Sequence, residues 1–150
     1  MARKNHENRT DLYGKAVSNL LYHGTGTKLK VGDIVIPRDS LLTKKGGAGG
    51  FGGVAYATPQ LDTALFMARD AVDYGVNQGK KVRAYSVQPL DEDDTLESRD
   101  MGMNIPNRVE GTDHLSVPAV EVRSSKGFKV VGKVKLSKDS IKYIGFDHKY

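Results

Sequence analysis

The clearest helical pattern in the chain is confined to one segment. Most of the remaining elements are therefore expected to be strands. Between Thr58 and Gly75 one helical stripe is apolar, formed by Leu61, Leu65, Ala68 and Val72. Thr58 suits the N-cap, Pro59 the first helical position and Gly75 the end of the helix. A short amphipathic helix is also expected over residues 8–20, where apolar residues recur at every fourth position.

The other apolar residues fall in short runs that have the character of strands. Strands are expected over residues 20–23, 31–36, 54–58, 81–89, 117–123, 128–136 and 140–146. Strands outnumber helices and do not alternate regularly with them. The pattern therefore predicts an α+β fold with a mainly antiparallel β-sheet and one or two short helices. A chain of 150 residues is long enough for a single compact domain with its own core.

Glycine is concentrated in one stretch. Six of the 17 glycines lie within the eight residues 46–53. A flexible loop is expected over residues 44–53, because such a run has little intrinsic structure, and a flexible tail is expected over residues 1–10. A formal G-x-G-x-x-G pattern runs from Gly47 to Gly52, but a strand follows it where the dinucleotide fingerprint needs a helix. The loop is either a plain surface loop or a lid over a ligand.

Composition excludes several classes of protein. The chain has no cysteine, which excludes disulfides, a cysteine nucleophile and metal sites built on thiolates. No apolar run is long enough to cross a bilayer, and the first residues lack the apolar stretch of a secretory signal. The expectation is a cytoplasmic protein without membrane contact.

Charge is distributed unevenly along the chain, whose formal net charge is +5. Residues 91–100 carry six acidic side chains and one basic, whereas residues 121–150 carry eight basic and three acidic. The basic segment suggests a polyanion such as nucleic acid as a partner, with a solvated lysine face as the plainer interpretation. The lysines in question are Lys126, Lys129, Lys133, Lys135, Lys138 and Lys142.

One of the four histidines, His23, lies at a position where it could contact a ligand. His6, His23, His114 and His148 show no H-x-x-x-H spacing, so no metal site is expected. His23 ends an expected strand and precedes Gly24. A histidine there can present its ring to a cleft, while the bare glycine backbone reaches a flat amide. A buried histidine with satisfied hydrogen bonds is the commoner use of such a residue.

Two further features have a functional and a plain interpretation. Tyr56 lies between Ala55 and Ala57, so its ring is open to stack on another aromatic ring or to pack in a sheet. The run from Asp91 to Asp94 can place a carboxylate beside developing positive charge on a sugar. The same run also suits a solvated acidic turn or a weak cation site.

Three segments, taken in order, resemble a known family. They are Tyr22-His23-Gly24-Thr25 followed by Gly32-Asp33; Tyr56-Ala57-Thr58 leading into Thr63-Ala64-Leu65-Phe66-Met67-Ala68; and Val87-Gln88-Pro89 followed by Glu92-Asp93-Asp94. This order resembles the rifampin ADP-ribosyltransferases, which are single-domain enzymes of the His-Tyr-acid branch of the mono-ADP-ribosyltransferases. The similarity spans residues 21–94.

The resemblance implies split sheets around a cleft for NAD, which serves as the donor substrate without a metal. It implies that His23 holds the NAD ribose and that the backbone of Gly24 binds the nicotinamide carboxamide. Tyr56 would stack on the nicotinamide ring, and Thr25 and Phe66 would also contact NAD.

The acid of the catalytic set matches Asp94, with Asp93 as the alternative if the loop aligns one residue off. His23, Tyr56 and Asp94 would then form the catalytic residues. Such a carboxylate stabilises the positive charge that builds on the ribose when nicotinamide leaves.

The resemblance thus implies a monomeric enzyme that moves ADP-ribose from NAD to an acceptor and releases nicotinamide. The acceptor is a rifamycin-type hydroxyl or a nucleic acid, with a protein side chain as a third class. The alternative is a non-catalytic, basic β-domain that binds nucleic acid. A family member that binds NAD without turnover is a further possibility.

Overall fold

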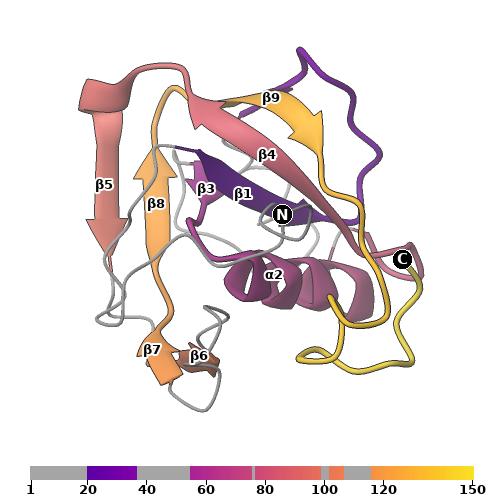
Figure 1. Ribbon diagram of the computed structural model, residues 1–150. Helices are drawn as coiled ribbons and strands as arrows, with labels where there is room; N and C mark the ends of the chain where they lie inside the picture. The colour runs from indigo at the N-terminus through magenta and orange to yellow at the C-terminus, as the bar shows by residue number, and fades with distance from the viewer. Residues whose placement is uncertain (1–19, 37–54, 76, 99–101, 107–115) are drawn as a thin grey trace.

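Strands pair antiparallel in all three sheets that the described residues form (Figure 1). The computed structural model describes residues 20–36, 55–75, 77–98, 102–106 and 116–150. Within them the chain is one small α+β domain with a single α-helix, which confirms the predicted fold class. The expected helix over residues 8–20, the tail over residues 1–10 and the glycine-rich loop lie outside the described residues.

Two sheets make up most of the domain. The larger has the strand order β1 (Leu21–Thr25), β4 (Arg83–Pro89), β9 (Phe128–Lys133) and β2 (Ile34–Val35). The second has the order β3 (Ala55–Ala57), β8 (Glu121–Ser124) and β5 (Thr95–Ser98). A small third sheet pairs β6 (Asn104–Pro106) with β7 (Ser116–Pro118). The first two sheets are joined by an isolated bridge between Tyr22 and Thr58.

Helix α2 (Leu61–Asp73) packs across β1, as its apolar stripe predicts (Figure 1). All four stripe residues are buried, together with Tyr22 and Ala84 from the larger sheet and Val82, which directly precedes β4. The helix approaches β1 so closely that a Cβ on Gly24 would lie 1.7 Å from the Ala64 carbonyl oxygen. Glycine at position 24 is therefore required for this packing.

A second core fills the space between the two sheets. It is formed by apolar side chains from both: Leu21, Val35, Ala55, Ala57, Tyr85, Val87, Val122, Phe128 and Val130. Because side chains alternate along a strand, the residues between these, such as Tyr56 and Arg123, lie on the opposite face of the second sheet.

The predicted start of the helix was wrong. Helix α2 begins at Leu61, with Gln60 at the N-cap, and not directly after Thr58. The backbone of Thr58 is taken by the bridge to Tyr22, so this residue is extended and cannot begin a helix. Its hydroxyl still accepts a hydrogen bond from the Gln60 N–H at 3.1 Å.

Three expected strands differ from those observed. Over residues 31–36 the strand is only Ile34–Val35, while Gly32, with φ +97°, and Asp33 form a turn that also bonds to Val130. Residues 117–123 contribute to two strands, β7 and β8, in different sheets. Residues 140–146 form hydrogen-bonded turns, in which the Ile141 carbonyl accepts from the N–H groups of Ile144 and Gly145. In the described part of the chain, no helix has the length and apolar character to cross a membrane.

Candidate functional site

The site is formed where β1 and β3 separate. Tyr22 and Thr58 exchange both backbone hydrogen bonds, with N···O distances of 2.7 and 2.9 Å. Beyond this bridge no further backbone hydrogen bond joins the described residues of β1 and β3. The two sheets therefore part next to His23 and Tyr56.

The ring of His23 contacts β3 at the point where the backbone hydrogen bonds between β1 and β3 end. His23 Nδ1 lies 3.0 Å from the Tyr56 carbonyl oxygen. A carbonyl oxygen only accepts hydrogen bonds, so Nδ1 carries the proton and donates it. In the neutral ring this fixes the lone pair on Nε2, which can accept a hydrogen bond from a hydroxyl. The fold thus brings His23 and Tyr56 together, and their role at an NAD site stays a prediction.

The backbone of Gly24 lies on the open edge of β1. In an antiparallel ladder, successive residues point their N–H and C=O groups to opposite sides. Tyr22 gives its groups to Thr58, so those of Gly24 also point away from β4. A continued ladder would join the Gly24 N–H to the Tyr56 carbonyl, but that carbonyl accepts from the His23 ring. Within the described part of the chain, the Gly24 N–H and C=O therefore face the split without a hydrogen-bond partner.

The open edge is short, because the end of β1 is closed by Asn77. Gly26 N–H donates to Asn77 Oδ1 at 2.9 Å, and Thr25 Oγ1 donates to the same atom at 3.2 Å. Asn77 Nδ2 donates to Thr27 Oγ1 at 2.9 Å. The Thr25 hydroxyl, which the resemblance assigned to NAD, is therefore buried and bound within this network.

Tyr56 lies on the half-exposed outer face of the second sheet. In the register of the sheet, Tyr56 is opposite Arg123, and Arg123 is opposite Leu96. The Arg123 guanidinium carbon lies 6.0 Å from the centre of the Tyr56 ring, which is the outer limit of a cation–π contact. Arg123 Nε donates to Glu121 Oε1 at 2.6 Å. The hydrogen bond to Glu121 and the charge of Glu121 raise the pKa of the Arg123 guanidinium.

Sequence reasoning missed Glu121 and Arg123. They alternate with the apolar Val122, so their sharing one face of a strand could be read from the chain. That this face also carries Tyr56 depends on the pairing of β3 with β8, which joins segments 67 residues apart (56 and 123) and has no local signal.

Gln60 is a third residue that the sequence did not indicate. It is fully buried, and its side chain spans from the start of α2 to the segment before β8. Gln60 Nε2 donates to the Pro118 carbonyl at 2.8 Å, and Gln60 Oε1 accepts from the Val120 N–H at 2.6 Å. This side chain fixes the start of β8 relative to β3.

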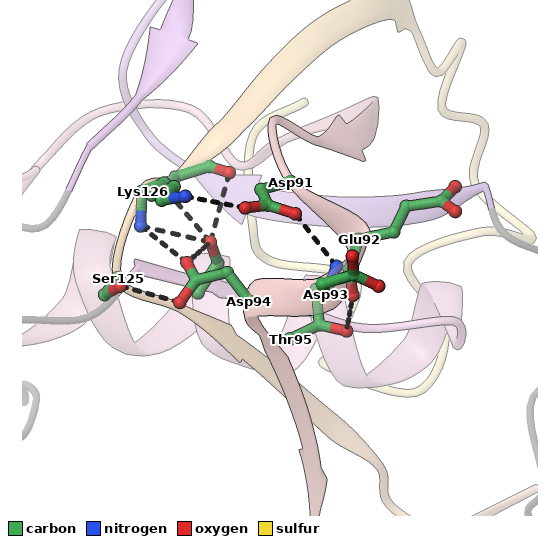
Figure 2. Close-up of polar contacts among 9 residues, drawn as sticks. Asp91, Glu92, Asp93, Asp94, Thr95, Ser125 and Lys126 are labelled. Atoms are coloured by element: carbon green, nitrogen blue, oxygen red, sulfur yellow. Dashed lines mark hydrogen bonds and ion pairs between the residues drawn. The ribbon is translucent and has the colours of Figure 1, made fainter.

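Asp94 contacts the turn between β8 and β9 (Figure 2). Its Oδ1 accepts from Ser125 Oγ at 2.8 Å, and its Oδ2 accepts from Ser124 Oγ and from the Lys126 N–H, both at 2.9 Å. The hydrogen bonds from Ser125, the Lys126 N–H and Ser124 lower the pKa of the Asp94 carboxyl. As an acid beside the ribose, Asp94 stays a prediction.

The rest of the acidic run forms a turn. It follows β4 as the short 3-10 helix η2 (Glu92–Asp94), which Asp91 caps by accepting from the Asp93 N–H. Lys126 Nζ donates to Asp91 Oδ2 at 2.6 Å, and this hydrogen bond lowers the pKa of Asp91. Glu92 points away from Lys126 (Figure 2). Over the residues that the structure describes, no three His, Asp or Glu side chains are grouped to hold a metal ion.

Phe66, assigned to NAD by the resemblance, lies on α2 and packs at the edge of the helix core. The Arg69 guanidinium carbon lies 4.0 Å from the centre of its ring. Both the ring and the guanidinium are partly exposed. No described contact joins Phe66 to Gly24 or Tyr56.

Several lysines of the C-terminal segment contact acidic or aromatic side chains, and others are exposed. Lys126 pairs with Asp91 and Lys142 pairs with Asp139, at 2.6 and 3.2 Å. Lys138 Nζ lies 5.5 Å from the centre of the Phe146 ring. Lys129 and Lys133 are exposed on β9.

No protein-family model matches the chain, and no curated protein matches it in sequence. The resemblance to the rifampin ADP-ribosyltransferases therefore rests on the three sequence segments alone.

Proposed function

We propose that the chain is a mono-ADP-ribosyltransferase that takes ADP-ribose from NAD and releases nicotinamide. The observation that carries the proposal is the Gly24 backbone at the edge of β1, whose N–H and C=O have no hydrogen-bond partner among the described residues. A primary carboxamide needs one acceptor for its N–H and one donor for its C=O. The C=O and N–H of Gly24 supply this pair on one edge, beside an aromatic ring and a histidine.

The neighbouring side chains suit the rest of the donor. Tyr56 presents an aromatic ring on a half-exposed face, where a nicotinamide ring can stack. His23 is held beside the split by the hydrogen bond from Nδ1 to the Tyr56 carbonyl, and we assign it to the donor ribose, as the resemblance implies. Catalysis by such a site comes from holding the leaving group in position and from electrostatic stabilisation of the ribose.

The acceptor follows from the resemblance and the charge. A rifamycin-type hydroxyl is the acceptor of the family that the chain resembles. The exposed lysines on β9 support a nucleic acid as the other candidate. We place the enzyme in the cytoplasm as a monomer.

Label transfer from adenine-labelled NAD tests this function. Purified protein is offered rifampicin, DNA, RNA or a cell lysate, and nicotinamide release and labelled product are measured together. Transfer to one acceptor is the expected result. His23→Ala and Tyr56→Ala should each abolish release, whereas Tyr74→Ala, at a tyrosine that is 75% exposed elsewhere, should not.

A folded protein that releases no nicotinamide from any mixture contradicts the proposal. Binding of DNA or RNA that weakens steeply with salt and ignores His23 and Tyr56 would then favour the non-catalytic β-domain. NAD binding without release would favour a member of the family that has lost turnover.

A further inference from the structure

We propose that Glu121, and not Asp94, is the carboxylate that faces the donor ribose. This assignment rests on the proposed function, since it concerns the same site. It places the acid of the catalytic set on β8, next to the strand that carries Tyr56.

The strand register places Glu121 on the face of the sheet that carries Tyr56. Tyr56 is directly opposite Arg123, and Glu121 lies two residues before Arg123 on β8. Side chains two residues apart project from the same face of a strand. Val122, between them, points into the core with Ala57. Glu121 thus lies on the same face of the sheet as Tyr56, next to the cross-strand pair of Tyr56 and Arg123.

Two side chains hold Glu121 in place. Arg123 donates to its Oε1 at 2.6 Å, and only 13% of the Glu121 side chain is exposed. Gln60 binds the backbone of Pro118 and Val120, directly before Glu121. The contact with Arg123 uses one carboxylate oxygen, and no described residue binds Oε2. This oxygen can accept a hydrogen bond from a ribose hydroxyl.

Asp94, in contrast, has no carboxylate oxygen without a hydrogen-bond partner. Its two oxygens accept three hydrogen bonds from residues 124–126, and it fastens the turn between β8 and β9. Each oxygen of Asp94 thus accepts at least one hydrogen bond from this turn, whereas Oε2 of Glu121 has no partner among the described residues. The two acids therefore have different tasks: Asp94 holds a turn, and Glu121 faces the site.

The bond changes need a negative charge where Glu121 lies. The bond between ribose C1′ and the nicotinamide nitrogen breaks, and its electron pair leaves with nicotinamide, which becomes neutral. Positive charge builds on the ribose until a lone pair of the acceptor forms the new bond to C1′. The acceptor proton passes to water. A carboxylate bound to a ribose hydroxyl stabilises the charge during this step.

Glu121→Gln and Asp94→Asn form the matched pair of variants that tests the assignment. Each removes one charge and keeps an oxygen acceptor. Nicotinamide release is measured at saturating NAD, NAD binding is measured by calorimetry, and thermal melting reports the fold. We expect Glu121→Gln to slow release by about a hundredfold or more. We expect the Kd for NAD to change by less than about tenfold. Asp94→Asn should keep most of the rate.

Two results would overturn the assignment. Release by Glu121→Gln at the wild-type rate would exclude Glu121 as the acid, and loss of release in a folded Asp94→Asn protein would return the role to Asp94. Wild-type protein that neither binds NAD nor releases nicotinamide would instead overturn the proposed function, and this assignment with it. If Glu121→Gln does not fold, Glu121→Asp provides the test, because it keeps the charge and withdraws it from the site. A normal rate in that folded variant would count against Glu121.

Discussion

At the scale of single residues, the site depends on one exchange of hydrogen-bond partners. The Tyr56 carbonyl, which could continue the ladder with Gly24, accepts from the His23 ring instead. The same contact fixes the histidine tautomer and leaves the Gly24 backbone on an open edge. Sequence patterns indicated His23, Gly24 and Tyr56 as a possible set, but the partner of each ring and backbone group came only from the structure.

The pH dependence of stability reports what Asp94 does. Its hydrogen bonds lower the pKa of the Asp94 carboxyl in the folded protein below the usual 3.8. The stabilisation of the fold by the ionised carboxylate is therefore complete above that pH. The stabilisation is lost as the pH falls through the lowered pKa. We expect Asp94→Asn to have a lower Tm than wild type at pH 7, and the difference to shrink in acid. Thermal melts between pH 7 and pH 2 measure this.

Asp93→Asn is the matched control for this prediction, because Asp93 is exposed in the same turn. Its melting temperature should follow that of wild type at every pH. Equal stability of Asp94→Asn and wild type at neutral pH would show that the Asp94 hydrogen bonds do not stabilise the turn.

At the scale of elements, sequence patterns predicted types better than boundaries. The α2 stripe and the strand at Arg83–Pro89 could be predicted, because local periodicity determines which face is buried. The start of α2 could not be predicted, because Thr58 is held by Tyr22, 36 residues earlier in the chain (58 and 22). Residues 140–146 have enough apolar side chains for a strand, but their hydrogen bonds are local and make turns.

The packing of α2 on β1 leaves no room for a side chain at position 24, and this can be tested by substitution. Gly24→Ala places a methyl group against the Ala64 backbone, which cannot move aside without shifting the helix. We expect a loss of about 1–3 kcal/mol in the free energy of unfolding, as in other overpacked cores. Denaturant unfolding followed by circular dichroism gives the value.

Gly132→Ala is the matched control for the glycine. A Cβ there would lie at an ordinary 3.9 Å from the Ser86 Cβ, and the backbone of Gly132 is not left-handed. Its stability should stay near that of wild type. A Gly24→Ala protein as stable as the control would mean that α2 is not held so closely against β1.

At the scale of the whole molecule, the proposed function depends on how the two larger sheets meet and separate. They meet at the Tyr22–Thr58 bridge and part directly beyond it, with α2 packed across β1 and the second core between the sheets. This arrangement is non-local, so the sequence could predict an α+β fold but not the face shared by Tyr56, Arg123 and Glu121. The resemblance pointed to Asp94, whereas the register of β3 with β8 favours Glu121.

The central claim is that the open Gly24 backbone binds the carboxamide of nicotinamide. Titration of nicotinamide into ¹⁵N-labelled protein, followed by NMR, tests it directly, with pyridine as the control that lacks the carboxamide. We predict a downfield shift of the Gly24 N–H with nicotinamide and little change with pyridine. A Gly24 N–H that does not move at saturating nicotinamide, or moves equally with pyridine, would contradict the claim.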